Sequence, residues 1–191
     1  MRAPSEEGGG GPLQIRQATA MDGREVARIQ IETWRASYAG LLPKDYLIRL
    51  SLEERSAWWR EAIARHREGR TFVALGPTEG SLVGFGTCGP ARRESFGLQG
   101  EVYSLYVDLD WQNRGVGRRL LTRLFEELAA QGYGSAMIRV LAANPARYFY
   151  EAMGGEPVGE GHEYFGGLKL AILAYGWRDL QGWLAKAQRR S

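Results

Sequence analysis

The chain has 191 residues, a hydrophobic share of 44% and a formal net charge of +3 from 25 basic and 22 acidic side chains. This length and composition predict one globular domain with a sizeable core, and no apolar run reaches the ~18 residues that a membrane-spanning helix requires. A single cysteine, Cys88, excludes an intramolecular disulfide framework and favours the cytoplasm. The small basic excess fits an anionic ligand but is weak evidence for nucleic-acid binding.

The first 12 residues, MRAPSEEGGGGP, are predicted to form a disordered tail, and residues 13–191 a single domain without internal repeats. The domain opens with an alternating strand over residues 13–18. Asp22 is predicted to cap the helix that follows, and Ser51 to cap the third helix of this region. The three predicted helices cover residues 22–38, 45–50 and 51–69. Two strands, over residues 71–76 and 81–88, are predicted to form a hairpin.

The most informative stretch covers residues 101–121 and reads EVYSLYVDLDWQNRGVGRRLL. Alternating side chains over residues 101–107 predict a largely buried strand, residues 108–114 turn the chain, and a helical spacing begins at Val116. A strand that feeds a glycine-bearing turn at the start of a helix presents unpaired backbone N–H groups at the positive end of the helix dipole. Such a place binds phosphate.

The remaining elements complete a mixed pattern. We predict a buried strand over residues 136–141 and a short helix over residues 146–153, after Asn144-Pro145. Two antiparallel strands over residues 158–165 and 168–177 follow, and then a terminal helix over residues 179–188. The whole order predicts an α/β fold of the α+β type. We expect a mixed, mostly antiparallel central sheet of about seven strands, with one parallel crossover, flanked by helices.

The turn Gln112-Asn113-Arg114-Gly115-Val116-Gly117 is the strongest candidate for a ligand site. Its glycines let the backbone approach a ligand closely, successive N–H groups can wrap a pyrophosphate, and Arg118 and Arg119 follow at once. The sequence matches neither a Walker loop nor a dinucleotide fingerprint. Taken alone, it fits a phosphate site and an ordinary glycine-rich turn equally well.

This turn resembles the pyrophosphate loop of the GNAT superfamily of acyl-CoA N-acyltransferases, Gln/Arg-x-x-Gly-x-Gly/Ala, through Gln112, Gly115 and Gly117. A second match is NPARYFYE over residues 144–151, where the family often has an Asn and then an aromatic-Tyr-Glu sequence on a short helix. Gly155-Glu156 departs from the Gly-Phe of many members. The resemblance covers roughly residues 13–179. It implies the GNAT-like fold and direct transfer of an acetyl group from acetyl-CoA to an amine, and no metal site is expected.

The resemblance also implies catalytic roles. Tyr150 matches the tyrosine that protonates the departing CoA thiolate, although a core aromatic is the alternative; Tyr148 is expected to point to another side of the helix. Glu101 matches a catalytic glutamate of some members and would act as base through ordered water or with a raised pKa. An exposed carboxylate at a strand end is the alternative for Glu101.

The predicted binding residues follow from the same resemblance. Expected contacts with acetyl-CoA come from Leu105, Tyr106, Val107, Gln112, Asn113, Arg114, Gly115, Val116, Gly117, Arg118, Asn144 and Tyr150. The strand residues are expected to act through their backbone, and Asn144 through its side chain, with a helix cap as its alternative role. Trp34, Tyr38 and Glu101 are expected at the acceptor pocket, although helix packing is favoured for Trp34.

These observations predict a cytoplasmic N-acetyltransferase whose acceptor is an amine, with a small molecule preferred over a protein. The family often pairs through its late strands, so a homodimer is plausible. Two alternatives remain: a CoA-binding sensor with little catalysis, and a nucleic-acid-binding domain that uses Arg114, Arg118, Arg119 and Arg123. No pattern in the sequence identifies the acceptor.

Overall fold

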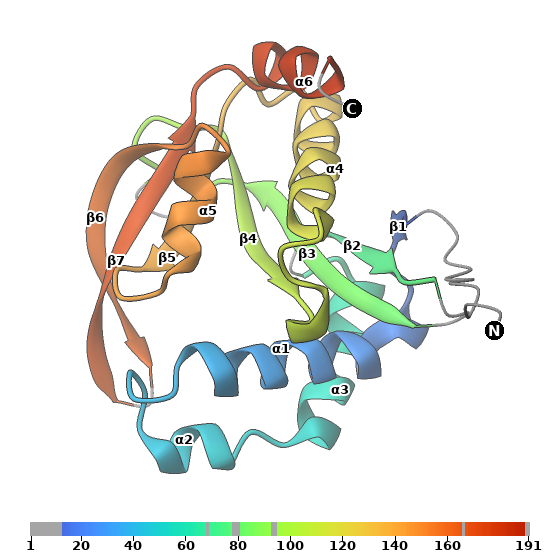
Figure 1. Cartoon of the computed structure of the whole chain (residues 1–191), viewed down its shortest axis with the longest axis vertical. Helices are drawn as coiled ribbons and strands as arrows, with labels where there is room; N and C mark the ends of the chain where they lie inside the picture. Colours follow the sequence, from blue (N-terminus) through green and yellow to red (C-terminus); the bar gives the residue numbers. More distant parts are fainter. Residues whose placement is uncertain (1–12, 68, 78–80, 93–94, 166, 190–191) are drawn as a thin grey trace, which may run out of the picture.

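The structure is a computed structural model that describes residues 13–67, 69–77, 81–92, 95–165 and 167–189. The predicted tail over residues 1–12 lies outside the described residues. The described chain forms one seven-stranded sheet in the order β1-β2-β3-β4-β5-β7-β6, with helices packed against it (Figure 1). All neighbouring strands are antiparallel except β4 and β5. The predicted mixed, mostly antiparallel sheet flanked by helices is therefore confirmed.

The strands and helices follow the predicted order. The strands are β1 (Gln14–Gln17), β2 (Arg70–Leu75), β3 (Leu82–Pro90), β4 (Gly100–Val107), β5 (Ala136–Leu141), β6 (Glu156–Phe165) and β7 (Leu168–Trp177). The α-helices are α1 (Gly23–Ser37), α2 (Lys44–Ile48), α3 (Leu52–Ala64), α4 (Val116–Ala130), α5 (Ala146–Ala152) and α6 (Leu180–Gln188). The helix predicted to reach residue 69 ends earlier, because the chain turns at His66 with a φ of +50°.

The two predicted helix caps have different outcomes. The Ser51 hydroxyl accepts a hydrogen bond from the Glu54 amide at 3.3 Å, as a capping residue does. Asp22 precedes α1, but its carboxylate does not cap that helix. It accepts instead from the Arg16 guanidinium at 2.7 and 2.8 Å and from the Thr19 amide at 2.7 Å. Asp22 therefore ties β1 to the start of α1.

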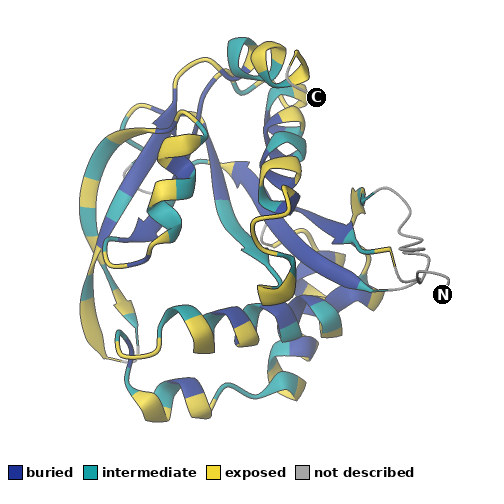
Figure 2. Cartoon of the chain, viewed as in Figure 1, coloured by how far each residue is buried: buried dark blue, intermediate teal, exposed yellow. Residues whose placement is uncertain are grey.

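The two faces of the sheet are covered by different helices. On one face α4 packs Leu121, Leu124 and Phe125 against the strands. On the other face α1 and α3 bury Ile29 and Trp59. Figure 2 shows the buried residues concentrated along the central strands and the inner sides of these helices. Among the described residues, no helix combines the length and apolar character that crossing a membrane requires.

The sheet opens at its centre. The parallel pairing of β4 with β5 covers three residue pairs, from Gly100↔Ala136 to Val102↔Ile138, and no pairing is described beyond them. A shift in the β3–β4 register adds one residue to β4 at Tyr103, between the pairs Thr87↔Ser104 and Cys88↔Val102. Such a bulge bends a strand. The backbone groups of residues 103–107 that point away from β3 therefore have no neighbouring strand.

Candidate functional site

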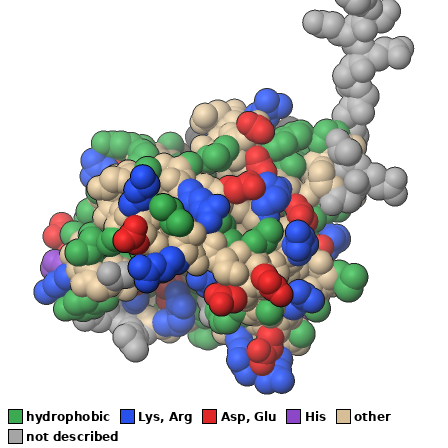
Figure 3. Space-filling model, turned by 90° about the horizontal axis from the view of Figure 1, so that it is seen from below, with side chains coloured by type: hydrophobic (Ala, Val, Ile, Leu, Met, Phe, Trp, Pro, Cys, Tyr) green, Lys and Arg blue, Asp and Glu red, His purple; other side chains and the backbone are tan. Residues whose placement is uncertain are grey.

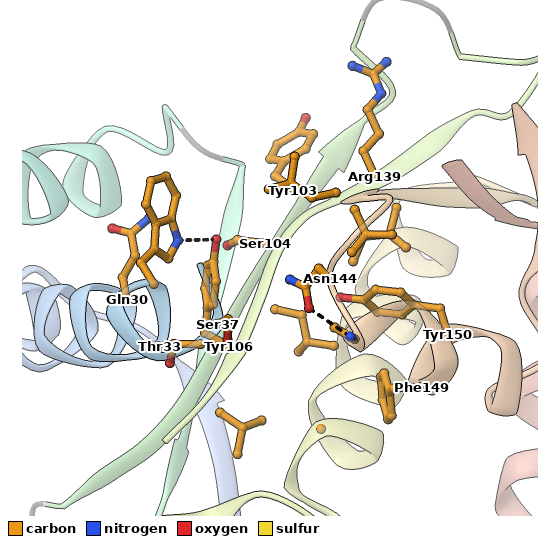
Figure 4. Close-up of a pocket in the computed structure, with 18 of the residues that line it drawn as sticks. Gln30, Thr33, Ser37, Tyr103, Ser104, Tyr106, Arg139, Asn144, Phe149 and Tyr150 are labelled. Carbon is orange, nitrogen blue, oxygen red and sulfur yellow. Dashed lines mark hydrogen bonds between the residues drawn. The ribbon is translucent and has the colours of Figure 1, made fainter. Parts of the chain in front are cut away.

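A cavity of about 1020 Å³ lies where β4 and β5 diverge. Its walls come from β4, the turn before α4, the β5–α5 turn, α5, α1 and β6. Figure 4 shows residues of α1 on one side and Asn144, Phe149 and Tyr150 on the other, with Tyr103 and Arg139 at the end where the strands still meet. The cavity therefore joins two surfaces that belong to different faces of the sheet.

The turn before α4 offers an uninterrupted run of backbone N–H groups. Asn113 and Gly115 have positive φ values of 59° and 80°, which turn successive amides toward the same side. No described residue accepts a hydrogen bond from the amides of residues 113–118, and the first paired amide is that of Arg119, which donates to the Gly115 carbonyl at 3.1 Å. Unpaired amides at the start of a 15-residue helix form an anion-binding geometry.

The side chains of this turn have separate positions. Gln112 donates to the Val107 carbonyl at 3.3 Å and so holds the turn against the end of β4. Arg118 lines the cavity, whereas the Arg114 guanidinium lies 5.2 Å from the centre of the Trp111 ring, outside the cavity lining. Val116 is fully buried in the core, so only its backbone is available to a ligand. Leu105 and Val107 likewise pack their side chains toward α4.

Asn144 makes two bonds within the protein. Its carbonyl oxygen accepts from the Ala146 amide at 2.9 Å, the capping role expected before Pro145. Its amide nitrogen donates to the Tyr38 hydroxyl at 3.4 Å. Asn144 thus links the end of α1 to the start of α5. Its side chain lines the cavity from this position.

Tyr150 and Tyr148 lie on different sides of α5, as the sequence predicts. Tyr150 is 5% exposed and lines the cavity, and its hydroxyl has no hydrogen-bond partner among the described residues. Burial raises its pKa above the ordinary value, and nearby Tyr38 raises it further. Tyr148 is 57% exposed and accepts from the Arg147 guanidinium at 2.7 Å. Both tyrosines line the cavity, but of the two only Tyr150 has a buried hydroxyl without a partner among the described residues.

Glu101 is buried, so its alternative role as an exposed carboxylate is wrong: its side chain is 1% exposed. One carboxylate oxygen accepts from the Arg92 backbone amide at 2.8 Å, and the other accepts from the Arg92 guanidinium at 3.1 Å. That guanidinium also lies over the Tyr103 ring, 4.0 Å from its centre. Glu101 is thus held in a fixed position at the closed end of the cavity.

The Tyr106 side chain lines the cavity, whereas the sequence predicts a binding role for its backbone alone. Its hydroxyl accepts from the Trp34 indole at 2.8 Å, and the Gln30 amide also lies close to it. Gln30 is oriented by the Trp59 indole, which donates to its carbonyl oxygen at 2.8 Å. Burial raises the pKa of Tyr106, so the hydroxyl keeps its proton. An indole can only donate, which leaves the Tyr106 proton free to face the cavity.

One side of the cavity, formed by α1 and β6, is where the acceptor is expected, and we call it the acceptor side. It combines residues from distant parts of the sequence. Trp34 packs edge-on against Tyr38 and Phe165, with ring centres 5.4 and 5.8 Å apart. Trp34 and Tyr38 both line the cavity, and Trp34 also serves in packing. The Thr33 hydroxyl beside them is buried without a partner among the described residues. No sequence pattern points to the further lining residues Arg139, Glu163 and Phe165.

Cys88 is a buried core residue, as expected. Its side chain is fully buried, and burial raises the pKa of its thiol to about 12. The nearest polar contact is the Leu124 carbonyl at 3.6 Å. A protonated thiol in this position is not a nucleophile.

Comparisons with known proteins agree with this geometry. Residues 28–155 match the acetyltransferase (GNAT) family. An uncharacterized N-acetyltransferase, YuaI of Bacillus subtilis (strain 168), is 34% identical over 168 residues, which are 88% of this chain and 94% of that protein.

Two solved structures illustrate the likeness of the fold. Ribosomal-protein-alanine N-acetyltransferase from Brucella melitensis is 28% identical with a TM-score of 0.64, covering 86% of this chain and 98% of that one. PaiA N-acetyltransferase from Thermoplasma acidophilum, solved with coenzyme A, is 17% identical with a TM-score of 0.64, covering 87% and 100%. The family match and the extent of the B. subtilis likeness show that this chain belongs to the GNAT family and is an acetyl-CoA-dependent acyltransferase.

Proposed function

We propose that the protein transfers the acetyl group of acetyl-CoA directly to the amine of a small molecule. The observation that carries this proposal is the continuity of one cavity, which runs from the turn before α4, where Asn113, Gly115, Gly117 and Arg118 line it, to the unengaged hydroxyl of Tyr150. Acetyl-CoA supplies the acetyl thioester. Residues 113–118 fit its pyrophosphate, because backbone amides at a helix N-terminus bind phosphate oxygens without a metal.

The residues of β4 would hold the arm of the cosubstrate. Residues 103–107 have backbone groups that no neighbouring strand uses, and an extended ligand with amide groups can pair with them. The same groups would stabilise the negative charge that develops on the thioester oxygen. The PaiA structure solved with coenzyme A is an example of this fold that binds such a ligand. Arg118 would neutralise further phosphate charge from the cavity wall.

Tyr150 would donate the proton that the departing thiolate requires. Its raised pKa keeps the hydroxyl protonated at neutral pH, and an acid must be protonated to act. Glu101 would accept a proton from the attacking amine through water, because its oxygens are already engaged by Arg92. The nitrogen forms a bond to the acetyl carbon, the carbon–sulfur bond breaks, and CoA leaves as the thiol.

A second acceptor class has an observation in its favour. The Brucella melitensis relative is described as a ribosomal-protein-alanine N-acetyltransferase, so a protein amino terminus is the alternative to a small amine. The nucleic-acid alternative has less support, because Arg123 is paired with Glu127 at 3.3 Å and Arg114 lies against Trp111. Seen from below, the surface carries interspersed basic and acidic side chains (Figure 3).

Thiol release from acetyl-CoA tests the proposal. We expect release with small primary amines, and a loss of about 10²–10⁴ in kcat when Tyr150 is changed to Phe, with CoA affinity kept. Tyr148→Phe, on the exposed side of the same helix, is the matched control and should keep its activity. Tight CoA binding without release from any amine or alanine-terminated peptide would favour the sensor alternative. Equal activity of Tyr150→Phe and wild type would remove Tyr150 as the acid.

A further inference from the structure

The acceptor side of the cavity has an anionic end formed by β6. Burial alternates along the second half of this strand: Gly161, Glu163 and Phe165 face inward, whereas Glu160 and His162 are exposed. Glu163 and Phe165 both line the cavity, as does Ile172 of the neighbouring strand. The side chain of Glu163 is therefore directed at a ligand rather than at bulk solvent alone.

Glu163 has no ion-pair partner among the described residues, and it is half-buried. Glu163 lies near the Tyr38 hydroxyl. Burial raises the pKa of that hydroxyl, and the Glu163 carboxylate raises it further. A partly buried carboxylate without a cation of its own can pair with the positive charge of a ligand. The geometry thus leaves a place for a cation beside Glu163.

Aromatic rings surround the same place. The Trp34 ring lies edge-on to both Tyr38 and Phe165, so the three rings form a corner rather than a stack. Aromatic faces attract ammonium groups, by up to about 2 kcal/mol when the cation is desolvated. The C-terminal end of α1, at Ser37, lies beside this corner, and the helix dipole is negative there. The Glu163 carboxylate, the aromatic corner and the end of α1 therefore all favour a positive charge at this end of the cavity.

Two arginines that line the cavity, Arg92 and Arg139, lie away from this end. Arg92 is paired with Glu101. Arg139 stands opposite Ala174 on β7, whereas Glu163 stands opposite Leu170, four residues earlier on that strand. At ~3.3 Å per residue this is a separation of about 13 Å along the strand direction. The anionic end is thus separate from the positive groups at the closed end of the cavity.

We propose that the acceptor is an aliphatic diamine or polyamine, whose distal ammonium group is held by Glu163 and the rings of Trp34 and Phe165 while the other amine is acetylated. This inference rests on the proposed acetyl transfer. The distal group keeps its proton and takes no part in the bonds that form and break. It positions the reacting amine, and Glu163 is a specificity residue rather than a catalytic one.

Three amines of matched length test the proposal: 1-aminobutane, 1,4-diaminobutane and 4-aminobutanoate. We expect kcat/KM for the diamine to exceed that for the monoamine about tenfold, with the aminocarboxylate below both. Glu163→Gln should reduce the diamine-to-monoamine ratio to about one. Glu160→Gln, on the exposed face of the same strand, should keep the wild-type ratio. CoA affinity of each variant confirms that the fold is kept.

A probe that cannot be acetylated gives an independent measurement. Butyltrimethylammonium should inhibit competitively against the amine, and Glu163→Gln should weaken that inhibition about tenfold. Thiol release with equal preference for monoamine and diamine would overturn the diamine inference and leave the proposed acetyl transfer intact. Absence of release with every amine, despite CoA binding, would overturn both. A preference for alanine-terminated peptides over the diamine would overturn the diamine inference in favour of a protein acceptor.

Discussion

The two halves of the cavity are built in different ways. The turn before α4 is a backbone site: residues 113–118 are consecutive, and their amides are exposed by two positive φ angles and the start of a helix. The acceptor side is a side-chain site, assembled from α1, β4, the segment that follows β3 and β6. A backbone site needs a local sequence only, whereas a side-chain site needs the whole fold. A substitution in the first should act through backbone conformation or added charge, and a substitution in the second through the side chain that is lost.

The largest expected effect tests the backbone site. Gly117 is the second residue of α4, and a Cβ added there would have its nearest neighbour, a Phe149 ring atom, at 3.4 Å, so the Cβ of Gly117→Asp makes an ordinary contact. An acidic residue in the first turn stabilises a helix but places a carboxylate beside the amides meant for phosphate. We expect CoA affinity to fall by roughly 100-fold or more, an electrostatic loss of ~2.7 kcal/mol, with an unchanged or higher melting temperature.

Calorimetric titration with CoA and thermal unfolding measure the two quantities. Thr122→Asp adds the same charge farther along the same helix and serves as the control. Tight CoA binding by Gly117→Asp would show that the amides of this turn are not the phosphate site.

A stability effect of intermediate size tests the closed end of the side-chain site. Arg92→Ala removes the guanidinium from a carboxylate that is 1% exposed, whereas Arg92 itself is 49% exposed. Removing one partner of a buried ion pair costs ~3–5 kcal/mol, and the retained Arg92 backbone bond should reduce the cost to about 2 kcal/mol. Glu101→Gln should destabilise less, because its amide carries no charge and Arg92 can turn to solvent. Denaturant unfolding of both variants checks this order.

A smaller effect should distinguish positioning from chemistry on β4. Tyr106→Phe removes the hydroxyl that accepts from Trp34 and keeps the ring packed against Phe85. We expect KM for the amine to rise about tenfold, because the indole loses its partner and the acceptor loses a donor. CoA affinity should stay unchanged. A loss of kcat as large as that of Tyr150→Phe would instead indicate that Tyr106 is a proton donor to the leaving group.

The smallest effect concerns Cys88. Its thiol is buried and its pKa is raised to about 12, so the thiolate is a negligible fraction below pH 9. Native protein should therefore give almost no reaction with a thiol reagent, and one thiol per chain after denaturation. Rapid labelling of native protein would mean that the strands around Cys88 open readily.

The fold and the backbone site could largely be predicted from the sequence, because both depend on local patterns. Alternation along β4, the glycines of the turn and the helical spacing of α4 lie within 30 residues of each other. The neighbours of Tyr106 could not be predicted, since Trp34 is 72 residues away in sequence. Glu163 has no motif, and its inward direction depends on strand register. The family resemblance points to Glu101, but its pairing with Arg92 depends on the path of the segment that follows β3.

The short pairing between β4 and β5 has a consequence for motion. Three residue pairs join a four-stranded half to a three-stranded half, so the sheet is continuous only near Glu101. A ligand lying along β4 would supply backbone partners that the protein itself omits. Hydrogen exchange should therefore show slower exchange on cosubstrate binding for those amides of residues 103–107 that point away from β3.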